Sequence, residues 1–395
     1  MNALKKKLDK AKPNFEKGGK LEKFHSVFDG FYTFLFTPNE TSKKGVQIHD
    51  SNDSKRTMII VVLALLPCCL FGMWNVGYQH ALAVGDMNHN LFHLFFYGLW
   101  AVLPQILTAY IVGLGIEFIV AQIRGHEIQE GFLVSGILIA MIMPVDTPCW
   151  MIAVAVAFAV IFAKEVFGGT GYNFLNVALV TRAFLFFAYP SRMSGDQVFV
   201  SLGNMPAVDG FTGATPLGQL ASAQPHAVAT DVIGNPLSIA DFFWGTIPGS
   251  WGETSTFCIL IGAAILLSTG MASWKVMSSA LVGGLFMAFI AHSFASPLYP
   301  VSYLNPLEQL CLGGFMFAIV FMATDPVTSC RTETGKYIYG FLVGAIAILI
   351  RCYNTGYPEG AMLSVLLMNC FAPLIDYLVV NSNIRRRLKR ARINA

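Results

Sequence analysis

Apolar residues occur in long runs along most of the chain, after a polar and Lys-rich stretch at residues 1–57. A membrane-spanning helix needs about 20 apolar residues to cross about 30 Å of hydrocarbon. Ten runs approach that length: 58–78, 94–121, 131–148, 150–166, 173–190, 254–271, 277–295, 308–324, 337–352 and 360–380. The pattern predicts an all-α polytopic membrane protein with about ten transmembrane helices.

Glycine and proline interrupt several of these runs, and some runs are short. A broken helix is tolerated at membrane depth only where other parts of the protein or a cavity satisfy the freed backbone groups. We therefore expect an internal site near the interruptions rather than a plain helical bundle.

The two halves of the chain resemble each other. The segment 130–148 is similar to 308–326, with Gly136 aligned to Gly314, and a TGY tripeptide follows in each half. Five spans in each half force the second copy into the opposite orientation, which gives two inverted five-helix repeats, as in many transport proteins. Chance matching of small residues, which are common in membrane helices, is the alternative.

Lys and Arg are distributed unevenly over the loops, and this bias predicts the orientation. With the N-terminus in the cytoplasm, only Arg192 and Arg351 fall outside or at that edge, and Arg182 lies within a span. Both termini are then cytoplasmic, at a bacterial inner membrane. The expected parts are a cytoplasmic N-terminal extension (1–57), a first five-helix repeat (58–190), a periplasmic loop (191–253), a second five-helix repeat (254–380) and a basic cytoplasmic tail (381–395).

Composition narrows the function classes. Hydrophobic residues make up 55% of the chain and charged residues 12%, against about 25% charged in soluble domains. The net charge of +3 gives no reason to expect nucleic acid as a partner. The eight cysteines form no CxxC pair, and His89 and His93 alone are too few ligands for a metal site. No GxGxxG follows a strand, so NADH oxidation would occur on a partner subunit.

Candidate chemistry gathers in the segment DGFTGATPL, at 209–217 in the predicted outer loop. Small neighbours leave the hydroxyl of Thr215 accessible, a hydroxyl can accept a phosphoester, and FMN ends in a phosphate. Small polar residues are also ordinary in loops, so the segment alone does not decide. The block 164–190 adds three charged residues, a Gly-Gly-Thr-Gly turn and two asparagines within membrane depth, where polar groups are expensive and often functional.

Four segments together resemble one known family. They are KEVFGGTGYNFLNVALVTRAFLFFAYP (164–190), DGFTGATPL, FMATDP (321–326) and YPEGAMLSVLLMNCFAPLID (357–376). They are similar to the signature segments of the family that contains the B subunit of the Na+-translocating NADH:quinone oxidoreductase and the D subunit of the related Rnf complex. The resemblance covers nearly the whole chain. The N-terminal extension and GHEIQEGF (125–132) look more like the quinone reductase subunit.

The resemblance implies two flavins. In this family the last threonine of [ST]-G-A-T bears FMN through a phosphoester bond, which falls on Thr215; Thr212 stands where Ser is common. A second, non-covalent riboflavin is associated with the family, and Asn173 and Asn176 are the candidate amide partners for its ring. Hydrogen bonding between helices is the alternative role for these asparagines.

The family's electron acceptor is a quinone, ubiquinone in this prediction. Gly113, Gly115 and Glu117 in VGLGIEF offer room for a flat ring beside a carboxyl group, although close helix packing would also use such glycines. Sodium favours oxygen ligands, as hard cations do. The candidates for its path are Asp376, Asp325 and Glu165, of which the last two sit near span ends.

The implied function is that of a flavin-bearing subunit of a redox-driven sodium pump. Its partners would be the other subunits of a membrane reductase complex and a flavin transferase that attaches FMN. Two alternatives stay open: the D subunit of an Rnf-type oxidoreductase, and a channel-like solute transporter, which has no use for a phosphoester-linked flavin.

Overall fold

The computed structural model describes parts of residues 2–36 and, apart from gaps at 87–89, 125–130, 195–197, 204, 209–210, 355 and 357–358, residues 54–393. The described residues form helices and no β-strand, with one isolated bridge between Thr230 and Pro236. His89 and most of the predicted N-terminal extension lie outside the described residues.

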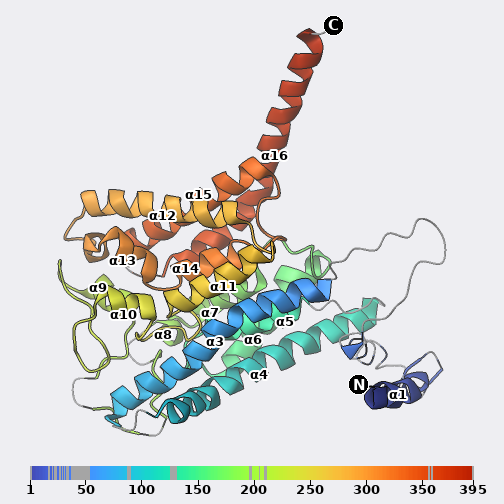
Figure 1. The fold of residues 1–395 in the computed structure, drawn as a ribbon, viewed down its shortest axis with the longest axis horizontal. Helices are drawn as coiled ribbons and strands as arrows, with labels where there is room; N and C mark the ends of the chain where they lie inside the picture. The colour runs from blue at the N-terminus through green and yellow to red at the C-terminus, as the bar shows by residue number, and fades with distance from the viewer. Residues whose placement is uncertain are drawn as a thin grey trace.

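The helices and their bounds follow in chain order (Figure 1). They are α1 (Asn2–Ala11), η1 (Lys12–Asn14), α3 (Ser54–Val84), α4 (Leu91–Arg124), α5 (Phe132–Met141), α6 (Cys149–Ala159), η3 (Val160–Lys164), η4 (Glu165–Phe167), α7 (Val177–Ala188), α8 (Pro190–Met193), α9 (Pro216–Ser222), α10 (Ile239–Trp244), α11 (Thr256–Ser268), α12 (Trp274–Ser293), η5 (Pro300–Tyr303), α13 (Pro306–Cys311), α14 (Phe315–Phe317), η6 (Ala318–Met322), α15 (Glu333–Tyr353) and α16 (Ala361–Ile393).

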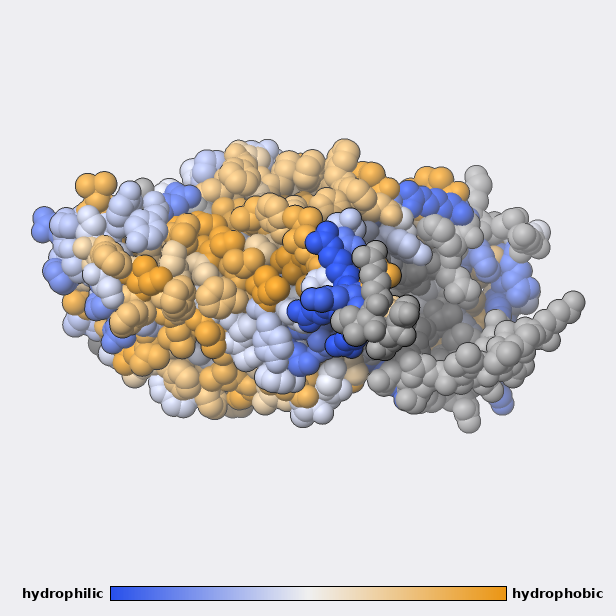
Figure 2. Space-filling model, turned by 90° about the horizontal axis from the view of Figure 1, so that it is seen from above, coloured by the Kyte–Doolittle hydropathy of each residue, from blue (hydrophilic) through white to orange (hydrophobic). Residues whose placement is uncertain are grey.

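Among the described residues, six helices are long and apolar enough to cross a membrane. They are Arg56–Val84, Leu91–Arg124, Cys149–Phe167, Trp274–Ser293, Glu333–Tyr353 and Ala361–Ala391. Large apolar side chains such as Trp100, Ile111 and Phe289 are mostly exposed on them. Figure 2 shows apolar residues over much of this face, with hydrophilic residues at its left end and in a group near the centre. Such a surface has lipid as its natural solvent, and the prediction of an all-α polytopic membrane protein is confirmed.

The long helices approach one another through small residues. A Cβ at Gly98 of α4 would overlap the Met73 carbonyl oxygen of α3, and one at Gly344 of α15 would overlap the Ala280 carbonyl oxygen of α12. Only glycine permits contact this close. Membrane helices associate without help from the hydrophobic effect, so backbone contact of this kind carries much of the packing.

Several predicted spans are only partly helical. The run 131–148 is helical only to Met141, the run 173–190 only from Val177, and the run 308–324 is divided among α13, α14 and η6. Helix α11 spans 13 residues, or about 20 Å, which is less than the hydrocarbon thickness. Helix α16 continues through most of the predicted basic tail to Ile393 and projects beyond the other helices (Figure 1).

Candidate functional site

The first helix break follows α5, where residues 142–148 leave the helical path. Carbonyl groups freed at membrane depth need donors. The amide nitrogen of Gln105 in α4 donates to the Pro144 and Val145 carbonyls at 2.8 and 2.7 Å. Arg182 in α7 donates to the Ile142 carbonyl. Buried side chains from two neighbouring helices therefore hold this break.

Arg182 is the centre of a buried polar cluster, with 1% of its surface exposed. Besides Ile142 it donates to the hydroxyl oxygen of Ser250 at 3.1 Å. It also forms ion pairs with Glu253, at 3.4 Å, and with Glu359. We call Arg182, Ser250, Glu253 and Glu359 the Arg182 cluster. It joins α7 to the segment before α11 and to the turn before α16.

The second break separates α13 from α14. Arg351 in α15, also 1% exposed, donates to the Gln309 and Leu312 carbonyls, the latter at 2.9 Å. Its guanidinium carbon lies 5.7 Å from the ring centroid of Phe315. Gly313 adopts φ +61°, a left-handed conformation that favours glycine. At each break, a buried arginine thus donates hydrogen bonds to carbonyl groups that the helix leaves free.

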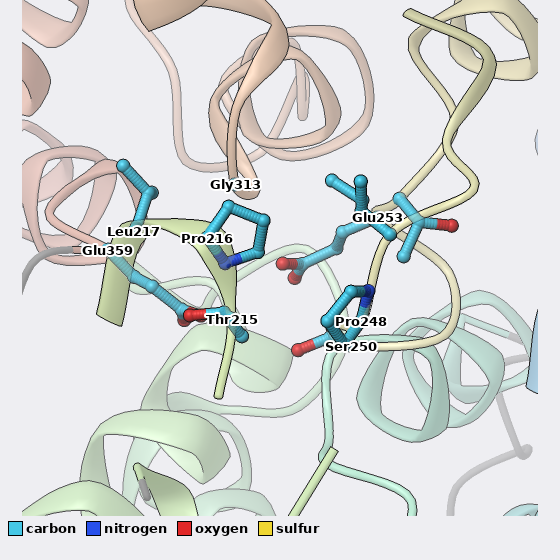
Figure 3. A pocket seen from close by; sticks show the side chains of 11 residues that line it. Thr215, Pro216, Leu217, Pro248, Ser250, Glu253, Gly313 and Glu359 are labelled. Carbon is cyan, nitrogen blue, oxygen red and sulfur yellow. The ribbon is translucent and has the colours of Figure 1, made fainter. Parts of the chain in front are cut away.

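Thr215 lines a small pocket of about 20 Å³ between the two breaks (Figure 3). Ser250, Glu253 and Glu359 line it from the Arg182 cluster, and Gly313 lines it from the second break. In Figure 3 Glu359 points toward Thr215, and the carboxylate of Glu253 points into the space between Pro216 and Ser250.

The local sequence fixes the direction of the Thr215 hydroxyl. Thr215 is the N-cap of α9, and its Oγ1 accepts a hydrogen bond from the Gly218 amide at 3.1 Å. Pro216 follows at the first helical position, where a missing N–H costs nothing. The hydroxyl is therefore held at the pocket wall while its own proton remains available.

Charge in this pocket is costly. Glu253 lies between α10 and α11, outside the spans, and burial raises the pKa of its carboxyl, while Arg182 beside it opposes the rise. Desolvation disfavours the ionised form, and a nearby positive charge favours it. Whether Glu253 is ionised thus depends on the positive charges near its carboxyl group, among them Arg182.

A second cavity, of about 140 Å³, is lined by three of the residues singled out in the sequence: Asn173, Asn176 and Asp325. Asn176 is the N-cap of α7 and accepts from the Ala178 and Leu179 amides, while its amide nitrogen donates to Asp325 at 3.4 Å. Asn173 donates to the Leu175 carbonyl at 3.0 Å, and its own oxygen accepts no hydrogen bond from a described residue.

Both π-helices of the described chain reach this second cavity. Lys164 at the end of η3 and Phe321 in η6 line it, together with Thr324. Single π-turns inside membrane helices are rare and occur often at functional sites. The cavity therefore lies where both halves of the chain depart from regular α-helix.

Glu117 forms an ion pair with Lys164, and both side chains are buried. Gly113 and Gly115, which precede Glu117, have different surroundings. A Cβ at Gly113 would overlap the Phe132 ring of α5, whereas Gly115 has nothing within 4 Å. Gly113 thus serves close helix packing, the alternative that the sequence had left open.

The other two acidic candidates line neither cavity. Glu165 pairs with Arg124 at 3.8 Å. Asp376 accepts hydrogen bonds from the Arg331 and Thr332 amides, at 2.8 and 3.0 Å, and from the Thr332 hydroxyl at 2.5 Å. These contacts tie α16 to the start of α15.

Sequence reasoning missed the grouping of Arg182, Glu253 and Glu359 around Thr215. The available signal was Arg182 within an apolar run, because a charge at membrane depth needs a partner. Glu359 stands just before the predicted run 360–380. Glu253 gave no such signal, since it falls at the end of the predicted loop. No group of three or more His, Cys, Asp or Glu suited to a metal ion occurs in the described part of the chain.

Comparison with known proteins agrees with the resemblance. The profile of the family described as NQR2, RnfD, RnfE matches residues 41–385. A protein from Ectopseudomonas mendocina (strain ymp), named as the B subunit of a Na(+)-translocating NADH-quinone reductase, is 43% identical over 406 residues, covering 97% of this chain and 98% of the relative. Proteins of the same name from Pseudomonas aeruginosa (strain LESB58) and Klebsiella pneumoniae (strain 342) are each 42% identical and cover 98% of this chain and 99% of their own. The chain therefore belongs to the NQR2, RnfD, RnfE family.

Proposed function

We propose that the chain is the flavin-bearing membrane subunit of a redox-driven sodium pump, which relays electrons from NADH toward ubiquinone and couples them to Na+ export. Full-length similarity to proteins named as the B subunit of a Na+-translocating NADH-quinone reductase supports this over the Rnf alternative. NADH would be oxidised on a partner subunit of the complex.

The observation that carries the proposal is the position of Thr215. Its hydroxyl lies at the wall of an open pocket rather than in a packed loop. The free space inside the pocket is about 20 Å³, so most of a flavin attached there would lie outside it. The hydroxyl of Thr215 is the group that fits a phosphoester-linked FMN, which would supply reversible electron transfer when bound.

The second cavity is the place we propose for riboflavin, with Asn173 as the better amide partner, because Asn176 already caps α7. Asp325 shares this cavity and is our first candidate for the Na+ path, ahead of Glu165 and Asp376, whose carboxylates are engaged elsewhere. Gly113 packs against Phe132 and Glu117 pairs with Lys164. Of the three residues proposed for a quinone site, only Gly115 therefore keeps open space beside it.

The orientation is also a proposal. Cytoplasmic termini at a bacterial inner membrane place 191–253 on the periplasmic face, where a flavin transferase of that compartment could reach Thr215. The inverted arrangement of the two halves stays a prediction. One buried arginine at a helix break in each half is compatible with it.

Removal of the acceptor hydroxyl tests the proposal. The Thr215→Ala subunit should lose flavin fluorescence from its band after denaturing electrophoresis, while Thr212→Ala should keep it. Thr212→Ala is the matched control, since it removes the same group three residues earlier. Fluorescence that survives in Thr215→Ala, or that disappears only in Thr212→Ala, would contradict the assignment.

A further inference from the structure

Helix α16 leaves the helical bundle near Asp376. The carboxylate of this residue accepts hydrogen bonds from the Arg331 and Thr332 amides, so it is level with the start of α15. The exposed rings of Trp274 and Tyr337 meet edge to face at the same end of α12 and α15. Aromatic rings of this kind gather where a membrane meets water. The residues of α16 that follow Asp376 therefore begin at the membrane surface.

The end of α16 carries positive charge only. Its described basic side chains are all exposed, and none of them forms an ion pair with a described residue; they are Arg385, Arg386, Arg387, Lys389 and Arg390. The sequence contains no Asp or Glu in 377–395. Positive charges at this density repel one another, and an anionic surface would relieve that repulsion.

The same segment has a narrow apolar stripe. Its members recur at intervals of three or four residues, which places them on one side of the helix; they are Tyr377, Val380, Ile384 and Leu388. Each of these side chains is between 45% and 63% exposed. The basic residues take up the rest of the circumference. A basic polar face beside an apolar stripe is typical of helices that lie in the membrane interface.

The direction of the segment also suits the membrane surface. In Figure 1 the end of α16 rises across the direction in which α12 and α15 run. Membrane helices tilt on average about 20° from the bilayer normal. A segment that crosses their direction therefore runs closer to the plane of the membrane than to its normal. This direction and the apolar stripe favour lipid over an acidic protein surface as the partner.

We propose that residues 377–391 of α16 bind the anionic lipid headgroups of the leaflet from which they emerge. In the proposed orientation that is the cytoplasmic leaflet, which has a negative surface potential. The apolar stripe rests at the hydrocarbon boundary, and the arginines beside it contact phosphate groups, for which guanidinium geometry is well suited. None of these residues lines the Thr215 pocket, so lipid binding here is independent of the flavin proposal.

Hydrogen exchange, followed by mass spectrometry of the purified complex in lipid nanodiscs, tests the proposal. One set of nanodiscs contains phosphatidylcholine alone, and the other contains phosphatidylglycerol as well. A helix end that projects into water opens readily and exchanges fast, whereas a bound one is protected. The amides of 381–391 should exchange about tenfold more slowly in the anionic nanodiscs, and high salt should remove most of that difference.

Removal of charge separates this segment from other basic regions of the chain. Each Lys or Arg close to an anionic membrane surface strengthens binding about fivefold. The double variant Arg385→Gln, Arg387→Gln should therefore lose most of the difference between the two lipids. The double variant Lys5→Gln, Lys6→Gln is the matched control, because it removes the same charge from exposed positions on α1. It should exchange in 381–391 like the wild type.

The apolar stripe has a test of its own. The double variant Ile384→Gln, Leu388→Gln keeps every charge and a good helix former at both positions, yet it should lower the protection in anionic nanodiscs. Equal exchange of the wild type in the two lipids would overturn the proposal. Fast exchange in both would leave the helix end in water, and slow exchange in both would assign it to a partner subunit of the complex.

Discussion

Arg182 and Arg351 perform the same structural task in the two halves of the chain, with different surroundings. Each is buried and donates to carbonyls freed by a helix break. Arg182 also pairs with two glutamates, whereas Arg351 is in no ion pair with a described residue and lies against the Phe315 ring. An arginine that donates to the freed carbonyl groups is therefore enough to satisfy a helix break. The glutamates around Arg182 are an addition, and they line the pocket that contains Thr215.

The largest effect should come from Arg182→Met. This change leaves Glu253 and Glu359 buried without their cation and the Ile142 carbonyl without its donor. Breaking a buried ion pair from one side costs about 3–5 kcal/mol. The purified complex should lose a correspondingly large part of its thermal stability in a denaturation scan. A stability equal to wild type would show that the cluster is not held by this arginine.

A smaller loss is expected for Arg351→Met. The methionine fills most of the volume, and two carbonyls lose their donors without any carboxylate being stranded. Each buried group left without a partner costs about 1–3 kcal/mol, part of which removal of the buried charge offsets. The same scan ranks the two variants. If Arg351→Met proves as damaging as Arg182→Met, the difference drawn between the two arginines is wrong.

Gly313→Ala sharpens the comparison at the point where the second break meets the pocket. A Cβ there would lie 2.6 Å from Leu217 Cδ1 in α9, and the backbone has φ +61°. The left-handed conformation alone costs a residue with a side chain about 1–2 kcal/mol. Stability should fall by that amount, with a lower yield of the covalent flavin. Gly115→Ala is the control, because it meets no atom within 4 Å and alanine favours helix; it should keep both.

The smallest effect on stability belongs to Asp376, outside both arginine regions. Asp376→Ala removes the acceptor at the start of α15, and loss of a cap costs about 1 kcal/mol. The covalent flavin should remain, and Na+-dependent quinone reduction should slow if this residue lies on the Na+ path. Asp376→Asn keeps a side-chain acceptor and separates the two roles. A normal rate and normal Na+ dependence in both variants would restrict Asp376 to joining α16 to α15.

The sequence was informative where one physical rule acts alone. Long apolar runs predicted the six long helices, because the bilayer fixes their length and composition. It was less informative at the breaks. Glycine and proline mark the runs 131–148 and 308–324 as interrupted, but the breaks are held by donors from Gln105, Arg182 and Arg351, which are distant in the chain. Thr215 could be named as a candidate from the family resemblance of its segment, but its neighbours Glu253 and Glu359 could not, because only the fold brings them together.

The central claim is that the flavin on Thr215 carries the electrons that drive Na+ export, and one measurement tests it directly. The wild-type, Thr215→Ala and Thr212→Ala complexes would be placed in lipid vesicles and supplied with NADH and ubiquinone, and quinone reduction and ²²Na⁺ uptake would be recorded together. The account predicts that Thr215→Ala loses both activities while Thr212→Ala retains both. Quinone reduction coupled to ²²Na⁺ uptake at the wild-type rate in Thr215→Ala would contradict it.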